Sequence, residues 1–455
     1  MLSRARRALD VALAAGVRVL LRVFFREVKV MGTRPLPRDR PLVLVANHEN
    51  NLLDPLLVLA FSGAYPRFLA KSTLWAHPLV APLLVLAGAL PVYRRQDEGA
   101  NVAANADTFA ASGELLAAGG AVALFPEGTS HNQPHRLPLK TGAARIVLEA
   151  QARHGAKGIL VLPVGLTYDR KDRFRSRVLV QLGPTLDPSP EAATYAVDPR
   201  RAVRALTARI AEALAEVTLN HGSWEEARLV RRAASLLAEE ATPNRPPTLS
   251  ELWTVRKWVW REYQALSTLD PQRAAALAGE VSRYDRAAGD VRWGGPAVPG
   301  PRLRPAAALL LTPVGLVGLV LNWLPYRLPG RLSRWLTRTP DEPASYKLMA
   351  GLVLFPLFWA AETAAAWRLT GNAGAFATLA AAPTAGYVAL LLSEAWEDVR
   401  EERRRRHLEA NPGRELRALA EQHDRVRREL AEAALTTGRA LLSDSWDTGS
   451  YFTKR

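Results

Sequence analysis

The chain has 455 residues, of which 48% are hydrophobic, so it is long enough for an α/β core and a second module. It contains no cysteine, which excludes disulfide bonds, thiolate metal sites and a cysteine nucleophile. The formal net charge of +16 indicates an anionic partner, either an acidic lipid surface or a phosphorylated substrate, unless the basic residues only solvate the surface. Nucleic acid is not expected as a partner, because the chain has no zinc-finger spacing, no RNP-like strand and no basic leucine zipper.

Residues 1–30 are predicted to form an amphipathic helix that lies in the lipid interface. Basic residues open the segment, as in a secretory signal, but Asp10, Arg18 and Arg22 interrupt the apolar stretch that follows. In a helix, an apolar stripe lies on the side away from the arginines, and it consists of Leu9, Leu13, Val17, Leu20 and Phe24. A helix packed on the soluble core is the alternative.

Three short, continuous apolar runs predict buried parallel strands. They cover residues 41–46, 121–125 and 158–164, and helical patterns separate them. Strands that alternate with helices predict an α/β fold over residues 31–190, with a largely parallel sheet flanked by helices. Polar clusters directly after the first two runs should therefore lie at the carboxyl ends of strands, where open α/β sheets bind their ligands.

The remainder of the chain is predicted to be helical. Residues 191–300 form a helical region with a Gly- and Pro-rich linker, residues 301–393 a membrane region, and residues 394–455 a charged helical tail in the cytoplasm. Apolar stretches occur at 305–326, 348–367 and 373–393. The later two have the roughly 20 apolar residues that a transmembrane helix needs.

The arginines that follow the apolar stretches constrain the topology. Arginines between residues 327 and 338, and the run at 403–406, should stay on the cytoplasmic side. Both conditions are met if the first stretch dips in and returns, with a break near Pro313, Gly315 and Gly318, while only the later two cross. We therefore expect a protein of the cytoplasmic (inner) membrane whose α/β domain faces the cytoplasm.

A histidine and a carboxylate follow the first predicted strand. His48 comes directly after this strand and Asp54 follows within two turns, as expected for a general base and the group that orients it. A histidine with a purely structural role would explain this cluster taken alone.

Two further polar clusters lie in the same domain. Arg94 and Arg95 end an apolar segment, and their planar guanidinium groups suit a phosphate, although a plain strand with a charged end explains them equally. The third cluster directly follows the strand at 121–125, where an ordinary turn with a capped helix is the alternative. Its members are Glu127, Gly128, Thr129 and, further along, Lys140.

The segments NHENNLLDP, GALPVYRR, FPEGTS and VLPVGLTY together resemble the four ordered blocks of the glycerolipid acyltransferase superfamily. The resemblance covers about residues 40–170. It implies that His48 is the general base and that Asp54 supports it. It also implies that Arg94 binds a phosphate and that Glu127 and Gly128 belong to the acceptor site, with Arg95, Thr129 and Lys140 as further candidates. Pro163 falls in the fourth block, which the family associates with acyl binding or the shape of the site.

The spacing between the histidine and the aspartate departs from the common family pattern, because five residues separate His48 from Asp54 instead of four. Positions six apart on a regular helix point about 120° away from each other, so the junction must be irregular. This spacing resembles the fungal-type glycerol-3-phosphate acyltransferase branch and its bacterial relatives. Thr129 departs from this branch, which usually has glycine at that position, and instead matches lysophosphatidate enzymes.

The resemblance implies an acyltransferase that moves a fatty acyl group from acyl-CoA or acyl carrier protein to the hydroxyl of glycerol 3-phosphate. Lysophosphatidate as acceptor is the alternative, and a transacylase between phospholipids is a third option. An inactive, membrane-anchored lipid-binding or scaffold protein is the alternative of another class. No cofactor and no metal are expected, since His131 and His135 have metal-like spacing but no further ligand in view.

Overall fold

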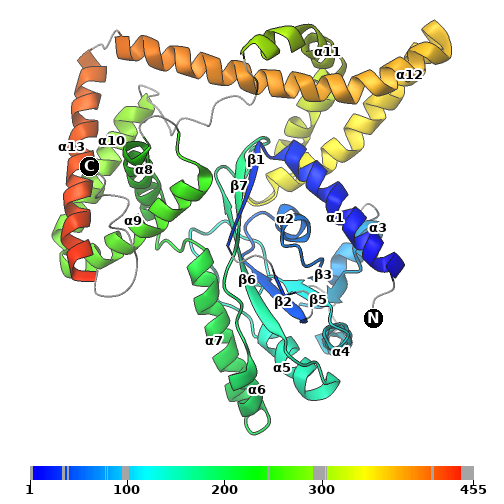
Figure 1. Cartoon of the computed structure of the whole chain (residues 1–455), viewed down its shortest axis with the longest axis vertical. Helices are drawn as coiled ribbons and strands as arrows, with labels where there is room; N and C mark the ends of the chain where they lie inside the picture. The colour runs from blue at the N-terminus through cyan, green and yellow to red at the C-terminus, as the bar shows by residue number, and fades with distance from the viewer. Residues whose placement is uncertain are drawn as a thin grey trace. The chain divides into compact units, whose positions relative to one another are not determined.

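The structure is a computed structural model that describes residues 4–32, 36–37, 40–76, 78, 80–94, 102–242, 246–290, 303, 305–410 and 414–441 (Figure 1). The chain forms two compact units. The first contains Met1–Asn220 together with Ser333–Leu348, and the second contains His221–Leu332 and Met349–Arg455. The predicted fold class is confirmed, since a largely parallel sheet flanked by helices is followed by helical segments, including apolar ones.

The first unit is built on a seven-stranded sheet with the order β1-β7-β6-β2-β5-β3-β4. Five neighbouring strands, from β6 to β4, run parallel, whereas β7 is antiparallel to β6 and parallel to β1. The strands are β1 (Glu27–Gly32), β2 (Leu42–Ala46), β3 (Arg67–Lys71), β4 (Leu90–Val92), β5 (Ala121–Leu124), β6 (Leu160–Tyr168) and β7 (Arg177–Leu182).

The three predicted strands correspond to β2, β5 and β6, the central strands of the sheet. All five residues of β2 are buried, as the continuous apolar run requires. The strands β1, β3 and β7 were not predicted, whereas β4 is the strand that was the alternative for the segment before Arg94. In β1 and β3, charged and apolar residues mix, so a continuous apolar run does not form.

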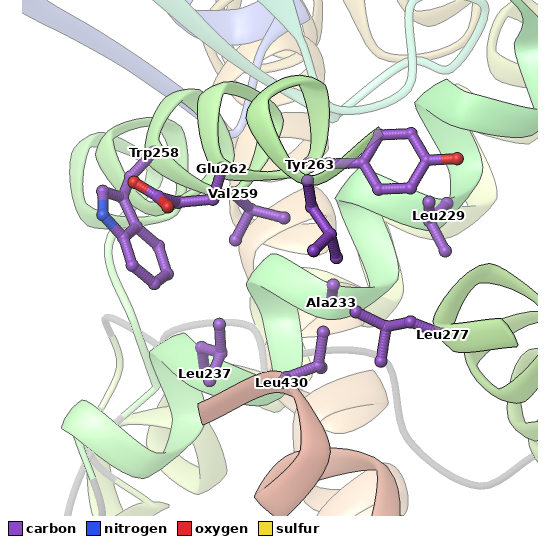
Figure 2. Close-up of a pocket in the computed structure, with 10 residues that line it drawn as sticks. Leu229, Ala233, Leu237, Trp258, Val259, Glu262, Tyr263, Leu277 and Leu430 are labelled. Carbon is purple, nitrogen blue, oxygen red and sulfur yellow. The ribbon is translucent and has the colours of Figure 1, made fainter. Parts of the chain in front are cut away.

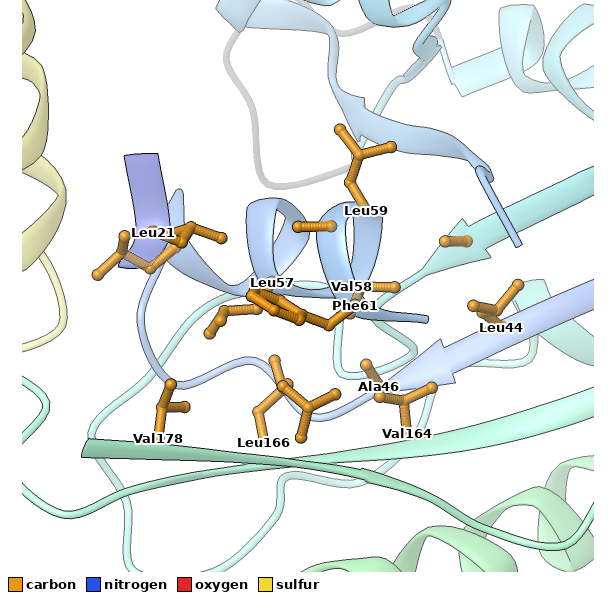
Figure 3. Close-up of a cluster of buried hydrophobic side chains, with 14 of the residues drawn as sticks. Leu21, Leu44, Ala46, Leu57, Val58, Leu59, Phe61, Val164, Leu166 and Val178 are labelled. Atoms are coloured by element: carbon orange, nitrogen blue, oxygen red, sulfur yellow. The ribbon is translucent and has the colours of Figure 1, made fainter. Parts of the chain in front are cut away.

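Alternate residues of β2 face opposite sides of the sheet and separate two cores. Leu44 and Ala46 pack with the helix α2 (Leu53–Phe61), which contributes Leu57 and Val58 (Figure 3). On the other face, Val43 and Val45 pack with the helices α5 (Gly142–His154) and α7 (Pro199–Val217). The helix α4 (Asn105–Ala117) contributes Leu116 to the same cluster. The first unit therefore extends past residue 190, because α7 completes its core.

The N-terminal helix α1 (Arg4–Phe24) packs on the first core through the apolar stripe that was assigned to lipid. Leu13, Val17 and Leu20 are partly buried there, and Phe24 is fully buried. Four of the five stripe residues therefore contact the protein core, whereas Leu9 is 38% exposed. Exposed Leu9, Val11 and Val19 keep the prediction of an interfacial helix open.

In the second unit, four helices surround a shared apolar core. They are α8 (Trp224–Ala241), α9 (Leu249–Leu269), α10 (Pro271–Asp290) and α13 (Arg414–Leu441). A small apolar cavity of about 40 Å³ lies among them, with Leu237, Val259 and Leu430 in its wall (Figure 2). The first unit also contains the short elements η1 (Ser72–Ala76), α3 (Ala81–Ala87), η2 (Val102–Ala104) and α6 (Ser189–Tyr195).

Two helices within the described ranges are long and apolar enough to cross a membrane, judged by length and composition. They are α11 (Pro305–Leu336) and α12 (Pro343–Ala410). The helix α12 breaks at Gly371, where φ is 73° and ψ is −162°, so two helical arms meet within the region that separates the predicted spans.

The predicted break in the first apolar stretch is wrong, because α11 is continuous from Pro305 to Leu336. Gly318 serves close packing instead, since a Cβ atom there would lie 1.9 Å from the carbonyl oxygen of Ala385 on α12. Asn322 reinforces this contact by donating to the Ala382 carbonyl at 2.9 Å and accepting from the Trp359 indole at 2.8 Å.

Candidate active site

His48 and Asp54 form a hydrogen-bonded pair at the carboxyl end of β2. His48 Nδ1 lies 2.8 Å from Asp54 Oδ2, and the Asp54 side chain is fully buried while that of His48 is 17% exposed. Because Nδ1 faces an acceptor, it carries the proton, which leaves the lone pair on Nε2. The described part of the chain offers no hydrogen-bond partner to Nε2. The imidazole is therefore oriented to accept a proton from a substrate.

An irregular turn brings the two side chains together despite the five intervening residues. Asn51 adopts a positive φ of 41°, which breaks the helical path between β2 and α2. The Asn50 backbone N–H then donates to Asp54 Oδ2 at 2.7 Å. The spacing of His48 and Asp54 predicted an irregular junction. The structure shows its form, which is a residue in the left-handed conformation followed by the start of a helix.

Tyr168 is a partner of Asp54 that the sequence analysis quoted within a motif but did not assign a role. Its hydroxyl donates to Asp54 Oδ1, so both carboxylate oxygens are bound. Burial, with the negative charge of Asp54, raises the pKa of Tyr168 well above its ordinary value and keeps it protonated as a donor. Its position shortly after the third predicted strand, at the end of the quoted segment VLPVGLTY, was the available signal.

The loop after β5 fixes the backbone and the ring of His48. The His48 ring stacks on Phe125 with centroids 4.0 Å apart. The His48 backbone N–H donates to Glu127 Oε1 at 3.0 Å, and its carbonyl accepts from the His131 N–H at 3.1 Å. His48 is thus held by the loops that follow two adjacent strands, as its predicted position at the carboxyl ends requires.

Glu127 is 2% exposed, and hydrogen-bond donors of the protein surround its carboxylate. Its second oxygen accepts from the His131 ring and from the Leu137 N–H, the latter at 2.8 Å. Burial lowers the pKa of His131, but the hydrogen bond and charge of Glu127 outweigh this effect, so the net pKa lies above its ordinary value. The geometry gives Glu127 a positioning role, while its predicted contact with the acceptor stays a prediction.

Two of the predicted cations converge on Gly128. Arg94 Nη1 donates to the Gly128 carbonyl at 2.9 Å. Gly128 has a φ of 76°, which favours glycine, and the Lys140 side chain packs against it, since a Cβ atom there would lie 2.6 Å from Lys140 Nζ. Thr129 follows directly, with its hydroxyl 3.3 Å from the Ser130 carbonyl. Arg95 lies outside the described residues.

Pro163, the residue assigned to the acyl site, is buried within β6. Its carbonyl accepts from the Gly183 N–H at 2.9 Å, and its ring faces Gly183, where a Cβ atom would approach to 2.8 Å. The role of Pro163 in acyl binding stays a prediction.

Glu49 and Lys171 are charged residues at the site that the sequence analysis did not select. Lys171 Nζ donates to the Glu49 carbonyl at 3.3 Å, and the Glu49 carboxylate accepts from Asn47 at 3.0 Å. Burial raises the pKa of Glu49 to about 7, although the charge of Lys171 opposes this shift. Burial also lowers the pKa of Lys171, against the charges of Glu49 and Asp341. Neither residue lies in a recognisable spacing pattern.

We expect Glu49 to make the protein less stable as the pH rises from about 4.5 to about 7. In this window the unfolded chain releases the Glu49 proton while the folded protein keeps it, so the stabilising contribution of the protonated form is lost. Replacing Glu49 with glutamine should remove this contribution. The melting temperature of Glu49→Gln relative to wild type should therefore increase between about pH 5 and pH 8, measured by differential scanning fluorimetry in detergent. The matched control is Glu225→Gln, at an exposed position, whose melting temperature relative to wild type should not change with pH. If the melting temperature of Glu49→Gln relative to wild type is also independent of pH, the prediction is contradicted.

Comparison with known proteins finds similarity over the residues that contain this site. Residues 27–167 match the family model Acyltransferase. An uncharacterised acyltransferase of Schizosaccharomyces pombe is 26% identical over 304 residues, which covers 48% of this chain and 45% of that protein. Glycerol-3-phosphate O-acyltransferase 2 of Saccharomyces cerevisiae is 33% identical over 133 residues, which covers 29% of this chain and 18% of that protein. The aligned regions thus span less than half the length of these relatives.

Similarity to solved structures was found as well. The crystal structure of the 1-acyl-sn-glycerophosphate acyltransferase of Thermotoga maritima has 24% sequence identity, with a TM-score of 0.34 over 47% of this chain and 83% of that chain.

Proposed function

We propose, from the premise that residues 27–167 form a domain of the Acyltransferase family, that the protein transfers a fatty acyl group from a thioester to the hydroxyl of glycerol 3-phosphate. The observation that carries this proposal is the oriented pair of His48 and Asp54. A yeast glycerol-3-phosphate acyltransferase among the relatives supports the choice of acceptor. The donor is acyl-CoA or acyl carrier protein, and the reaction requires no cofactor.

In this mechanism, His48 Nε2 removes the proton of the acceptor hydroxyl while the hydroxyl oxygen attacks the thioester carbonyl. The imidazolium is stabilised by Asp54, whose carboxylate is fixed by Tyr168 and the Asn50 N–H. The tetrahedral intermediate then collapses, the C–S bond breaks, and the thiolate leaves and takes up a proton. The products are an ester of the acceptor and a free thiol.

The acceptor phosphate is assigned to Arg94 and Lys140, because both cations lie beside Gly128 at the end of β5. An arginine fork and a lysine point charge together suit a phosphate monoester. The second candidate acceptor is lysophosphatidate, which Thr129 favours, since the resemblance associates a threonine at this position with such enzymes.

An assay with the purified full-length protein tests the proposal. Labelled glycerol 3-phosphate and lysophosphatidate are each incubated with acyl-CoA or with acylated carrier protein, and the acylated products are separated. The proposal requires faster acylation of glycerol 3-phosphate. Faster acylation of lysophosphatidate would favour the second candidate, product without any thioester would indicate a transacylase, and no product would favour an inactive lipid-binding or scaffold protein.

We further propose that the protein is integral to the inner membrane and that its first unit faces the cytoplasm. Ser333–Leu348 belongs to the same compact unit as residues 1–220, so these parts lie on one side of the membrane. Within the described residues between 220 and 305, no helix is apolar enough to span. Both ends of α11 then lie on the cytoplasmic side, so this continuous helix does not cross the bilayer. The two arms of α12 cross and return.

This topology makes a labelling prediction that uses the absence of cysteine from the chain. Single cysteines at Thr339, Thr370 and Glu421, all exposed positions, are probed with an impermeant thiol reagent on intact cells. Thr370→Cys should be labelled, because it lies next to the break of α12, whereas the other two should be labelled only after lysis. Labelling of Glu421→Cys on intact cells would require an odd number of crossings and would reject the topology.

A further inference from the structure

The segment that joins the two apolar helices belongs to the catalytic unit. Ser333–Leu348 is assigned to the first unit, although about 110 residues of the second unit separate it in sequence from Asn220. Ala344 and Leu348 are buried in the core cluster to which β2 and α2 contribute. Asp341 and Ser345 are also buried, at 6% and 5% exposure, so these two polar side chains need partners within the protein.

Ser345 meets the turn that connects His48 to Asp54. Its hydroxyl accepts from the Leu52 N–H at 3.0 Å and donates to the Asn50 carbonyl at 3.4 Å. One hydroxyl thus bridges the residues on both sides of Asn51, the position with a positive φ. The same Asn50 carbonyl also accepts from the Leu53 N–H at 2.9 Å, at the start of α2.

The other polar side chains of the segment reach the loops after the neighbouring strands. Asp341 Oδ2 accepts from the Ser130 hydroxyl at 2.5 Å, in the loop after β5. Lys347 Nζ donates to the Asp172 carbonyl at 2.5 Å, in the loop after β6. Together with Ser345, these contacts tie one segment to the loops that follow all three central strands of the sheet.

The turn at Asn50 to Leu52 depends on hydrogen bonds that maintain its shape. A non-glycine residue at positive φ is a strained conformation that the surroundings must maintain. The Asn50 N–H is itself a donor to Asp54, so a shift of the turn moves a partner of the catalytic carboxylate. Functional groups of this kind need to be held within about 0.5 Å of their working positions. From outside the turn, the Lys171 carbonyl accepts from the Asn50 side-chain amide at 2.9 Å, and the Ser345 hydroxyl adds a second constraint through the backbone of Asn50 and Leu52.

We infer that Ser345 is a positioning residue for the His48–Asp54 pair, supplied to the site by the segment between the two apolar helices. The inference rests on the proposed function, because the pair is given its catalytic role there. The longer spacing between His48 and Asp54 is compatible with a working pair because the turn accommodates the additional residue. Ser345, which is distant in sequence, stabilises that turn.

The test compares Ser345→Ala with Ser345→Thr in the full-length protein, with Ser267→Ala as matched control. Ser267 lies in α9, and its hydroxyl donates to the Tyr263 carbonyl of its own helix. Ser345→Ala should lower kcat about tenfold with little change in either KM, since it removes a hydrogen-bond bridge but no substrate contact. Ser345→Thr, which keeps the hydroxyl, should restore most of the rate. A kcat per folded molecule equal to wild type in Ser345→Ala would overturn the inference, and so would a lowered kcat that threonine fails to restore.

Hydrogen exchange separates the failure of this inference from the failure of the proposed function. In Ser345→Ala, amide exchange should become faster over residues 47–56, while α7 remains as in wild type. If the wild-type protein transfers no acyl group but exchange rises at the turn, the proposed function is wrong and Ser345 still holds the turn. Exchange at residues 47–56 that equals wild type, or that rises equally in α7, would overturn the role of Ser345.

Discussion

Replacing His48 with alanine is expected to lower acyl transfer by about 10²–10⁴-fold, the usual contribution of a general base. The variant should keep its fold and its association with membranes, because the His48 backbone contacts to Glu127 and His131 do not need the imidazole. Loss of the ring removes the group that takes the proton and leaves the Asp54 carboxylate with Tyr168 and the Asn50 N–H as partners. The measurement is kcat for purified protein at saturating concentrations of both substrates.

The matched control is His135→Ala, because His135 is an exposed residue that makes no assigned contribution to the site. It should retain wild-type turnover. Near wild-type turnover in His48→Ala would show that another group accepts the proton and would reject the mechanism, whatever acceptor the enzyme uses.

The second large effect is expected for Arg94→Ala, which should lower kcat/KM for the acceptor by about 10- to 100-fold. The guanidinium is assigned to the acceptor phosphate, and a hydrogen-bonded ionic contact of this kind is stronger than a neutral one. The KM for the acyl thioester should change little, because the donor is bound elsewhere. Arg94→Lys keeps the charge without the planar fork, so it should fall between alanine and wild type. Separate titrations of acceptor and donor measure these constants.

Arg153→Ala provides the control for the loss of one positive charge, since Arg153 is exposed at the end of α5. It should leave both titrations unchanged. Arg94 also donates to the Gly128 carbonyl, which suggests a structural alternative. If Arg94→Ala lowers kcat and leaves the acceptor KM as in wild type, this contact with the turn is its function, and the phosphate must be bound by other residues.

The sequence by itself determined the centre of the fold. Strands buried on both faces need continuous apolar runs, and this requirement located β2, β5 and β6. His48 and Glu127 directly follow two of those strands, so the parallel arrangement alone places them at the same edge of the sheet. The conflict between a five-residue spacing and regular helix geometry also predicted an irregular turn before its form was known.

The tertiary structure decided what depends on distant contacts. The apolar stripe of α1 fits lipid and protein equally well, and only the packing of Leu13 and Val17 on the core distinguishes the two. Glycines in α11 suggested a break, but close approach to α12 explains Gly318 without one. Tyr168 and Ser345 reach the catalytic turn across 114 and 293 residues of sequence, and no local pattern encodes such separations. Strand and helix periodicity are local properties of the sequence, so the sequence could identify groups with the right chemistry. Hydrogen-bond partners that are distant in sequence come together only on folding, so no local pattern identifies them.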